Sequence, residues 1–389
     1  MATRRENRGI HADNVGRLVR YTLLNEYLAL PIAGAAHYLT LKTSRKILVK
    51  LIRHAASLGL DISKINFGSL ARKALYLGIA GFALSANDFL TKWTANNWAM
   101  NKKDEWSDWS KEIVVITGGS SGIGENIAKL LLARNPKVTI VILDFAPLSW
   151  SIPKENRRRV HYYQADLSKP EVIKSVCRRI RKDIGHPTVL VNNAGLSRGF
   201  TVVEGRYADV EVTLKTNLQA PFLLAKEFLP DMIKKDHGHI VNMCSMSAVV
   251  PPPGIVDYAA SKAGLQALHE GLALELKYRH KAPRVRLTNV IPHFIRTPLF
   301  HGTPNQPRFL SPLLHVETVA EAVVNTLQSG YGQVIYLPGI MRYVTMLRAL
   351  PEWAFRILIR NGTANLAANF QGRQVIDENG GLKPLSSER

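Results

Sequence analysis

From about residue 111, short runs of apolar and β-branched residues alternate with longer segments whose apolar residues recur at helical spacing. Continuous apolar runs of this length are typical of parallel strands that are buried on both faces. Strands that alternate with helices indicate a parallel sheet covered by helices on both sides. We therefore expect an α/β fold built on a doubly wound parallel sheet. The expected strands are EIVVIT, VTIVIL, TVLVNN, HIVNMCS, VRLTNVIP and GQVIYLP.

Residues 1–110 follow a different pattern. Two uncharged apolar runs, 27–41 and 74–87, are both shorter than the roughly 20 residues that a membrane-spanning helix needs. Between them, in SRKILVKLIRHAASLGL, apolar residues fall at helical spacing and the cations lie mostly outside that stripe. A basic amphipathic helix of this kind can lie in a membrane interface.

Four of the six tryptophans crowd into residues 93–109. Indole rings favour the headgroup level of a bilayer. We therefore interpret residues 1–110 as a helical extension that associates with a membrane by monotopic or shallow insertion, with a hairpin as one possible form. The alternative is a helical cap packed on the main domain, because short apolar runs are often core helices.

The C-terminal residues 341–389 also combine apolar and basic positions. Their apolar residues are interspersed with four arginines, Arg342, Arg348, Arg356 and Arg360. This pattern predicts one or two amphipathic helices interrupted near Pro351, followed by a flexible tail. The expected domains are thus the extension 1–110, the α/β domain 111–340 and the C-terminal segment 341–389.

A glycine-rich turn, TGGSSGIGENIAKLL, joins the first expected strand to the first helix. Glycines permit a tight turn and let the backbone approach a pyrophosphate, which meets amide donors at the helix N-terminus. Such a loop alone is weak evidence, but the strand before it and the helix after it provide the context that a dinucleotide site needs. The candidate cofactor-binding residues in this turn are Gly118, Ser120, Gly122, Ile123 and Gly124.

Polar residues follow the next expected strands, at the sheet edge where ligands bind in this architecture. Asp144 lies 20 residues beyond Gly124 and is placed to bind the adenosine ribose, where its carboxylate would repel the 2′-phosphate of NADP. We therefore favour NAD, with NADP possible because Arg157–Arg159 lie downstream. Further candidates at strand ends, each of which could be an ordinary turn residue, are Asp166, Leu167, Asn193, Ala194 and Gly195.

Tyr258 and Lys262, in the segment YAASK, are four residues apart on an expected helix. Residues i and i+4 share a helix face, so the ammonium would lie beside the phenol. A neighbouring cation favours the phenolate and lowers the pKa of tyrosine from its ordinary value of ~10. The pair is a candidate proton-transfer device, although a packed aromatic and a solvated lysine would leave the same pattern.

Charge and cysteine content narrow the choice of partners. The net charge of +21 suggests nucleic acid or an anionic membrane surface. The chain has no zinc-finger spacing and no RNA-binding aromatic signature, so we expect no nucleic-acid partner and no metal site. Two cysteines, Cys177 and Cys244, cannot form a disulfide framework and suggest a reducing compartment. The polar, basic start of the chain predicts no cleavable signal peptide.

Several motifs, all in the same order, resemble the short-chain dehydrogenase/reductase family: TGGSSGIG, NNAG, TNLQAPF, CSMSA, YAASK and PHFIRTP. The resemblance covers residues 111–340 and implies a Rossmann-type NAD(P)-binding domain. Finer segments, FLPDMIKKDHGHIV, PHFIRTPLF and the tail from YLPGIM onward, resemble the membrane-associated branch that includes 17β-hydroxysteroid dehydrogenase type 11 and the epidermal retinol dehydrogenases.

The resemblance implies a catalytic tetrad of Asn217, Ser245, Tyr258 and Lys262. Ser245 is preferred over Ser247 because it stands 13 residues before the tyrosine. Tyr258 would take the alcohol proton while hydride leaves for the nicotinamide, and Lys262 would lower the tyrosine pKa and hold the nicotinamide ribose. Ser245 would donate to the substrate oxygen. Asn217 would hold a water that connects Lys262 to solvent.

The same resemblance assigns contacts along the cofactor. Thr297 would contact its nicotinamide end, and Pro292 is a further candidate cofactor-binding residue. The adenosine half or its neighbourhood would be contacted by Asp144, Asp166 and Asn193. One departure is that the family's usual Pro-Gly is Pro292-His293 here, which puts a side chain where glycine is common.

These features together predict an NAD(P)-dependent oxidoreductase that interconverts an apolar alcohol, such as a hydroxysteroid, a retinoid or a long-chain lipid alcohol, and its carbonyl. We expect it on the endoplasmic reticulum membrane or a lipid-droplet surface, with its catalytic domain in the cytosol, and the family implies a homo-oligomer. Two alternatives stay open: a catalytically silent NAD-binding scaffold at a lipid surface, and a soluble NADP-dependent carbonyl reductase.

Overall fold

The computed structural model describes most of the chain and divides it into two compact units. The described residues are 11–103, 105–297, 299–301, 309–363, 366, 370–372, 375–376 and 382–383. One unit, the N-terminal unit, is Ala12–Lys92. The other, the α/β unit, contains the chain from Trp93 onward.

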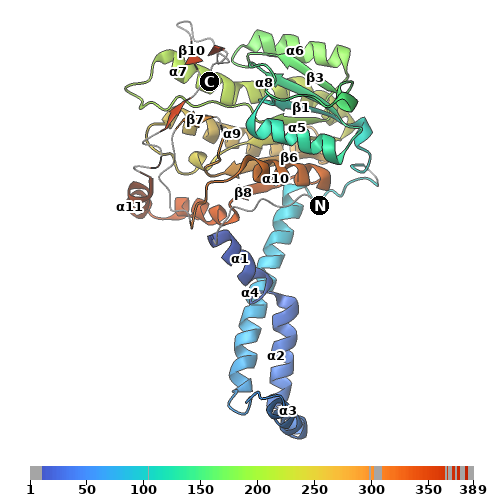
Figure 1. Ribbon diagram of the computed structural model, residues 1–389, viewed down its shortest axis with the longest axis vertical. Helices are drawn as coiled ribbons and strands as arrows, with labels where there is room; N and C mark the ends of the chain where they lie inside the picture. Colours follow the sequence, from blue (N-terminus) through green and yellow to red (C-terminus); the bar gives the residue numbers. More distant parts are fainter. Residues whose placement is uncertain are drawn as a thin grey trace. The chain divides into compact units, whose positions relative to one another are not determined.

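The N-terminal unit is helical, and its helices are α1 (Ala12–Tyr21), α2 (Glu26–Thr40), α3 (Arg45–Ser57) and α4 (Phe67–Ala95). Helices α2 and α4 lie side by side and α3 joins them at one end (Figure 1). They approach closely at a glycine of α4: a Cβ on Gly78 would lie only 2.6 Å from the side chain of Leu30 in α2. The buried small residues of this hairpin are Ala29, Ala33, Ala36, Ala71, Ala74, Gly78 and Gly81.

Helix α4 is the one helix in the described part of the chain that is long and apolar enough to cross a membrane. Only 17% of its most apolar window is buried within the protein. The expectation that the run 74–87 is too short to span is therefore corrected. The helix continues past the charges that bound this run, since Lys73 and Asp88 do not interrupt helical hydrogen bonding.

The α/β unit is organised around one parallel sheet of seven strands in the order β3-β2-β1-β4-β5-β6-β8. The strands are β1 (Ile113–Thr117), β2 (Thr139–Asp144), β3 (Val160–Gln164), β4 (Val189–Asn192), β5 (Gly238–Met243), β6 (Val285–Pro292) and β8 (Val334–Leu337). Each pair of adjacent strands in this sheet is hydrogen-bonded in parallel. The order reverses at β1 and β4, so the sheet is doubly wound, as the sequence predicted.

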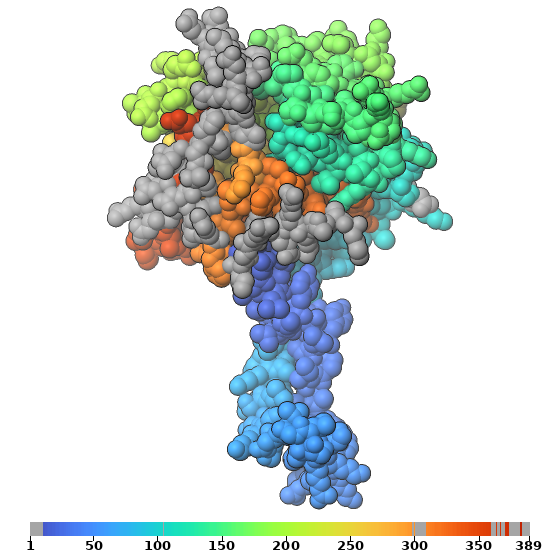
Figure 2. Space-filling view, in the orientation of Figure 1, coloured from blue at the N-terminus to red at the C-terminus, as the bar shows by residue number. Residues whose placement is uncertain are grey.

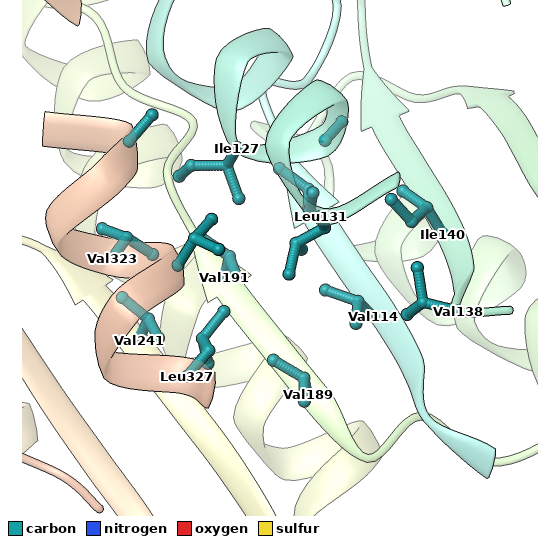
Figure 3. Close-up of a cluster of buried hydrophobic side chains, with 14 of the residues drawn as sticks. Val114, Ile127, Leu131, Val138, Ile140, Val189, Val191, Val241, Val323 and Leu327 are labelled. Carbon is teal, nitrogen blue, oxygen red and sulfur yellow. The ribbon is translucent and has the colours of Figure 1, made fainter. Parts of the chain in front are cut away.

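Helices cover both faces of this sheet (Figure 1). Successive strand residues point to opposite faces, so Val114 and Ile116 pack on one side and Val115 on the other. The first face carries α5 (Gly122–Arg134) and α10 (Val316–Ser329), and Figure 3 shows their Ile127, Leu131, Val323 and Leu327 packed against strand valines. The second face carries α6 (Pro170–Asp183), α8 (Ala220–Lys235) and α9 (Val256–Leu274).

The tryptophan-rich segment belongs to the α/β unit. Trp106 and Trp109 are buried in the core beneath α5 and α10, so interpreting them as headgroup-level residues is wrong. The neighbouring Arg286 is only 1% exposed and donates to the carbonyl of Ala99 and the side chain of Asn101. These buried polar bonds place the boundary between the units at residues 92 and 93 instead of 110.

The C-terminal segment forms two helical stretches, η7 (Gly339–Ala349) and α11 (Glu352–Thr363), separated at Pro351 as predicted. Where the sequence suggested a flexible tail, the described residues form short antiparallel pairs. Strand β9 (Gln371–Gly372) pairs with β7 (Phe300–His301), and β10 (Val375–Ile376) with β11 (Leu382–Lys383). Phe370, just before β9, is buried.

Candidate active site

The glycine turn between β1 and α5 has the conformation that only glycine adopts without strain. Gly118 and Gly122 have φ values of 65° and 63°, in the left-handed region. At Gly124, a Cβ would lie 2.3 Å from the carbonyl oxygen of Gly118, so any side chain would push the turn apart. The turn therefore presents bare backbone at the N-terminus of α5.

Asp144, the last residue of β2, is hydrogen-bonded to this turn. Its carboxylate accepts hydrogen bonds from the backbone N–H of Ser120 at 2.9 Å and of Ala146 at 3.0 Å. Burial raises the pKa of the Asp144 carboxyl, and the N–H donors of Ser120 and Ala146 act in the opposite direction. Asp144 also lines the cavity described below. The residue predicted to bind ribose therefore also stabilises the glycine turn by hydrogen bonding.

The loop after β4 is fastened to the same turn. The Asn193 amide donates to the carbonyl oxygens of Thr117 at 2.9 Å and Gly118 at 3.0 Å. The Thr117 hydroxyl in turn accepts from the N–H groups of Asn193 and Ala194, both at 2.9 Å. At the next residue, a Cβ on Gly195 would lie 3.4 Å from the Lys262 Nζ, which is ordinary van der Waals contact, so the loop lies directly beside the lysine.

Asp166 and Leu167 lie apart from the cavity. Asp166 accepts bonds from the N–H and hydroxyl of Ser168 and thus caps its own turn, while Leu167 is buried in the core under α6. Neither Asp166 nor Leu167 is among the described residues that line the cavity. Their cofactor roles stay predictions.

Tyr258 and Lys262 lie on one buried face of α9. The Lys262 Nζ is 5.6 Å from the centre of the Tyr258 ring and donates to the Met243 carbonyl, at the end of β5, at 2.8 Å. Ser245 follows β5, and its hydroxyl is hydrogen-bonded to the Tyr258 phenol. Three of the four predicted tetrad residues therefore meet at the carboxyl end of β5. The Ser247 hydroxyl has no hydrogen-bond partner in the described structure.

The pKa values correct one expectation. Burial raises the pKa of Tyr258 above its ordinary value, and the hydrogen bond from Ser245 opposes this rise only in part. Burial also lowers the pKa of the Lys262 ammonium to about 8. In the protein alone, removing both groups from water disfavours both charged forms, and this outweighs the lowering of the Tyr258 pKa expected from Lys262. The joint effect of Lys262 and a bound, positively charged NAD stays a prediction.

Asn217 lies in η4 (Lys215–Gln219), a π-helical turn between α7 (Tyr207–Leu214) and α8. Such turns occur frequently at functional sites. The Asn217 side chain accepts from the Leu196 N–H and donates to the Leu196 carbonyl, both at 2.8 Å, and donates to the Ser261 hydroxyl at 3.0 Å. It thus fixes the β4 loop against α9. The water predicted beside Asn217 stays a prediction.

A cavity of about 810 Å³ opens along the carboxyl ends of the strands. Its polar lining includes the glycine turn, Asp144 and the β4 loop, and Tyr258 and Lys262 also line it. Pro292 and Thr297 also line the cavity, and their contacts with the nicotinamide end of a cofactor stay predictions. The other end is apolar and includes Met246, Ile255, Phe294, Met341, Leu347 and Phe370.

Sequence reasoning missed two parts of this cavity. The C-terminal segment supplies part of its apolar wall, although Met341 and Phe370 are far from Tyr258 along the chain. The second part is the contact of His293, the residue that replaces the family's usual glycine. Its Nδ1 lies 2.6 Å from the Ser311 hydroxyl, so the side chain joins the loop after β6 to the segment before α10. The unusual Pro-His pair was the available signal, but nothing in the sequence identifies Ser311.

These residues fit a dinucleotide cofactor. The bare backbone at Gly118, Gly122 and Gly124 matches the close approach of a pyrophosphate, and the helix that follows directs N–H groups toward it. Gly118 and Gly122 of this turn line the same cavity as Tyr258 and Lys262. The arrangement can therefore bring a nicotinamide ring next to a proton donor and a lysine.

Comparisons with known proteins agree with this geometry. The family model described as short chain dehydrogenase matches residues 112–307. Dehydrogenase RED2 of Cochliobolus heterostrophus is 42% identical over 215 residues, which is 55% of this chain and 78% of that protein. Short-chain dehydrogenase/reductase 3 of Homo sapiens is 32% identical over 275 residues, 68% of this chain and 88% of the relative. Epidermal retinol dehydrogenase 2 of Mus musculus is 28% identical over 277 residues, which is 68% of this chain and 86% of that protein.

A solved structure supports the fold. The complex of 4-hydroxyisoleucine dehydrogenase with NADH superposes with a TM-score of 0.50 at 24% identity, covering 58% of this chain and 97% of that structure. The sheet order, the glycine turn, the matched family model and the relatives lead to the same conclusion. This chain belongs to the short-chain dehydrogenase family and is an NAD(P)-dependent oxidoreductase that acts on CH–OH groups.

Proposed function

We propose that this enzyme interconverts an apolar alcohol, of the hydroxysteroid, retinoid or long-chain lipid class, and its carbonyl at a membrane surface. The observation that carries the proposal is the wall of the cavity beyond Tyr258. Phe294, Met341 and Phe370 enclose that space, and it offers few groups that could satisfy a polar substrate. The similarity to an epidermal retinol dehydrogenase supports the same substrate class.

The proposed mechanism assigns one task to each residue of the tetrad. In the oxidation direction, the Tyr258 phenolate takes the hydroxyl proton of the substrate as the C–H bond gives up a hydride. The Ser245 hydroxyl, which donates to Tyr258 in the free protein, turns its one proton to the substrate oxygen when substrate binds. Lys262 supplies a positive charge 5.6 Å from the tyrosine ring, and Asn217 holds the β4 loop in place. The nicotinamide, when bound, accepts the hydride and is itself positively charged before transfer.

We also propose NAD as the preferred cofactor. The Asp144 carboxylate faces the cavity at the end of β2, where it would accept bonds from ribose hydroxyls. A second negative charge from a 2′-phosphate would be repelled there. The solved complex of a related dehydrogenase with NADH supports a nicotinamide cofactor in this fold without deciding between NAD and NADP.

Membrane association is proposed from the surface of the N-terminal unit (blue in Figure 2). Its large apolar side chains point outward, with Tyr27 exposed by 82% and Phe82 by 63%. Water does not favour such a surface, whereas hydrocarbon does. We propose an endoplasmic reticulum or lipid-droplet location. We also propose a homo-oligomer, and light scattering of the detergent-solubilised protein would measure its mass.

The decisive experiment is an activity screen of the full-length protein in phospholipid vesicles with NAD and with NADP. The substrates are a hydroxysteroid, a retinol and a long-chain alcohol, with a short water-soluble alcohol for comparison. We expect turnover of at least one apolar alcohol, a preference for NAD, and loss of turnover in Tyr258→Phe. A Tyr258→Phe variant that binds NAD and matches the wild type would contradict the assigned mechanism. A preference for NADP with small carbonyls would favour the soluble reductase alternative.

A further inference from the structure

We propose that residues 339–358 lie on a phospholipid surface and admit the apolar substrate from the lipid directly into the active-site cavity. We call these residues the entrance segment; they comprise η7 and the part of α11 that ends at Leu358. The inference rests on the proposed function, because it describes how an apolar alcohol reaches Tyr258. It adds a surface of the α/β unit to the membrane contact proposed for the N-terminal unit.

Helix η7 is a 3₁₀-helix of 11 residues. Runs of more than about three or four residues are uncommon in this conformation. Because a 3₁₀-helix has three residues per turn, side chains three residues apart lie above one another and form three rows along the helix. The rows of η7 differ in chemistry, so the regular spacing keeps different kinds of side chain on separate sides of the helix.

The first row lines the active-site cavity and consists of Met341, Val344 and Leu347. Met341 shares a buried cluster with Cys244 and Met246, in the segment that follows β5. The Arg348 guanidinium donates to the carbonyl oxygen of Val249 in the same segment, at 2.8 Å. Since this segment also carries Ser245, the contacts fix η7 beside the catalytic residues.

The second row of η7 is apolar and exposed. Its Tyr343 and Met346 are both more than half exposed. The exposed apolar surface continues in α11, where Trp353 and Ile357 are also more than half exposed and lie four residues apart on one helix face. Large apolar side chains grouped on a surface mark contact with a partner or a membrane.

The third row of η7 is polar and carries Arg342, Thr345 and Arg348. The entrance segment as a whole contains three arginines and one acid, Glu352. Tryptophan and tyrosine favour the headgroup level of a bilayer, and arginine is attracted to anionic lipid. A second copy of the chain, placed here by two-fold symmetry, would bring the same arginines together. An anionic phospholipid surface therefore fits these side chains better.

Leu358 connects the exposed surface to the cavity. It is 48% exposed and also lines the cavity, so the cavity wall reaches the protein surface in α11. In η7 the exposed Met346 is directly followed by Leu347, which lines the same cavity. An apolar alcohol that enters here from lipid passes between apolar side chains and avoids the unfavourable exposure of its surface to water.

The membrane contact is tested on the full-length protein with one fluorescent label at a time. Met346→Cys places a thiol in the exposed row, and Ser175→Cys places an exposed thiol on α6 as the matched control. The native cysteines, Cys177 and Cys244, are buried and should not compete for the label. Each variant carries an environment-sensitive nitrobenzoxadiazole label and is bound to vesicles of phosphatidylcholine and phosphatidylserine, with and without nitroxide-labelled lipid.

We expect the label at position 346 to brighten about threefold on vesicles and to be quenched by the nitroxide lipid, and the label at position 175 to change little. A label at position 346 that stays unquenched on vesicles carrying the protein would overturn the inference and leave the membrane association intact. Brightening that needs no vesicles and grows with protein concentration would show that a second copy covers this surface, and would overturn the inference as well.

A second experiment measures substrate entry. Met346→Ser combined with Trp353→Ser removes two exposed side chains that are not among the described residues lining the cavity. For the best apolar substrate of the activity screen, supplied in vesicles, kcat/KM should fall about tenfold, and for a short water-soluble alcohol it should change less than about twofold. The matched control combines Val203→Ser with Tyr207→Ser, which are exposed elsewhere on the α/β unit, and should change neither value.

The outcomes separate this inference from the proposed function. An unchanged kcat/KM for the apolar alcohol in vesicles, or an equal loss with both alcohols, would contradict entry through this segment while the substrate class stands. Turnover of the short alcohol alone by the wild type would overturn the substrate class, and substrate entry with it. The label at position 346 needs no turnover and decides the membrane contact in either case.

Discussion

The Lys262 Nζ lies 5.6 Å from the centre of the Tyr258 ring, and both side chains are buried on the same face of α9. The Lys262 ammonium is still charged at pH 7, although its buried surroundings favour the neutral amine. Burial lowers its pKa to about 8, from an ordinary value of 10.5. A buried ammonium that is required for chemistry should weaken the fold that contains it.

Lys262→Met should accordingly stabilise the cofactor-free protein while abolishing turnover. At pH 7 the lysine is charged in both the folded and unfolded states, so the folded state carries the full burial penalty. We expect the free energy of unfolding to rise by about 1–3 kcal/mol. The penalty disappears as pH rises from about 8 through 10.5, so the two proteins should converge there.

Denaturant titrations in detergent at pH 7 and pH 10 measure this difference. Lys226→Met, which removes an exposed lysine of α8, is the control and should change neither stability nor turnover. A Lys262→Met variant that is less stable than the wild type at pH 7 would show that the bond to the Met243 carbonyl outweighs the burial penalty.

Ser245→Ala and Ser247→Ala form a matched pair two residues apart. Only Ser245 is hydrogen-bonded to Tyr258, so its loss should reduce kcat by about 10²–10³-fold. Ser247 has a buried hydroxyl without a partner, and its replacement should change kcat less than fivefold. Steady-state kinetics with the best substrate of the screen compares them. Equal losses would mean that the catalytic serine has been misassigned.

Asp144→Asn should change cofactor preference. The amide removes the negative charge that would repel a 2′-phosphate, so the ratio of kcat/KM for NAD over NADP should fall by about tenfold or more. Its oxygen can still accept the Ser120 N–H bond, so the glycine turn should persist. Asp183→Asn, near the surface of α6, is the control. An unchanged ratio would argue against a ribose contact at Asp144.

His237 predicts a pH-dependent stability in the α/β unit. Its ring nitrogens lie 2.9 Å from Glu105 and 3.1 Å from Glu112, whose side chains are 6% and 4% exposed. Burial disfavours the imidazolium, but the bonds and charges of Glu112 and Glu105 outweigh it and raise the pKa of His237.

Because the folded-state pKa is the higher one, the stabilisation is complete below the ordinary value of 6.5 and is lost as pH rises through the folded pKa. The melting temperature of the wild type should therefore fall over that range by more than that of His237→Gln. At pH 6 the variant should be less stable by about 1–3 kcal/mol. His186→Gln, an exposed control near Asp231, should follow the wild type.

Phe370→Ala tests the apolar wall. Phe370 packs edge-on against Phe294 at 5.3 Å and shares a cluster with Tyr258. Its loss should raise KM for a steroid or retinoid about tenfold and change KM for a short alcohol much less. Phe222→Ala, exposed on α8, serves as the control. A uniform loss with every substrate would indicate displacement of Tyr258 instead of a lost substrate contact.

The sequence was sufficient for the sheet, the glycine turn and the pairing of Tyr258 with Lys262. Each of these is a local pattern: apolar strands, glycines between a strand and a helix, and an i, i+4 spacing. The order of the motifs then indicated the family, because Ser245 and Asn217 occur at the spacings that the family shows. The fold class and the enzyme class followed from these patterns without coordinates.

Tertiary structure decided what depends on contacts between distant segments. Trp106 and Trp109 resemble membrane anchors in the sequence, yet they fill the core, because Arg286 and its neighbours hold their segment to the sheet. Phe370 and Met341 reach the cavity only through the folded C-terminal segment. The sign of the Tyr258 pKa shift depends on burial, which local spacing does not reveal: a charge beside a phenol lowers its pKa in water, and loss of that water reverses the result.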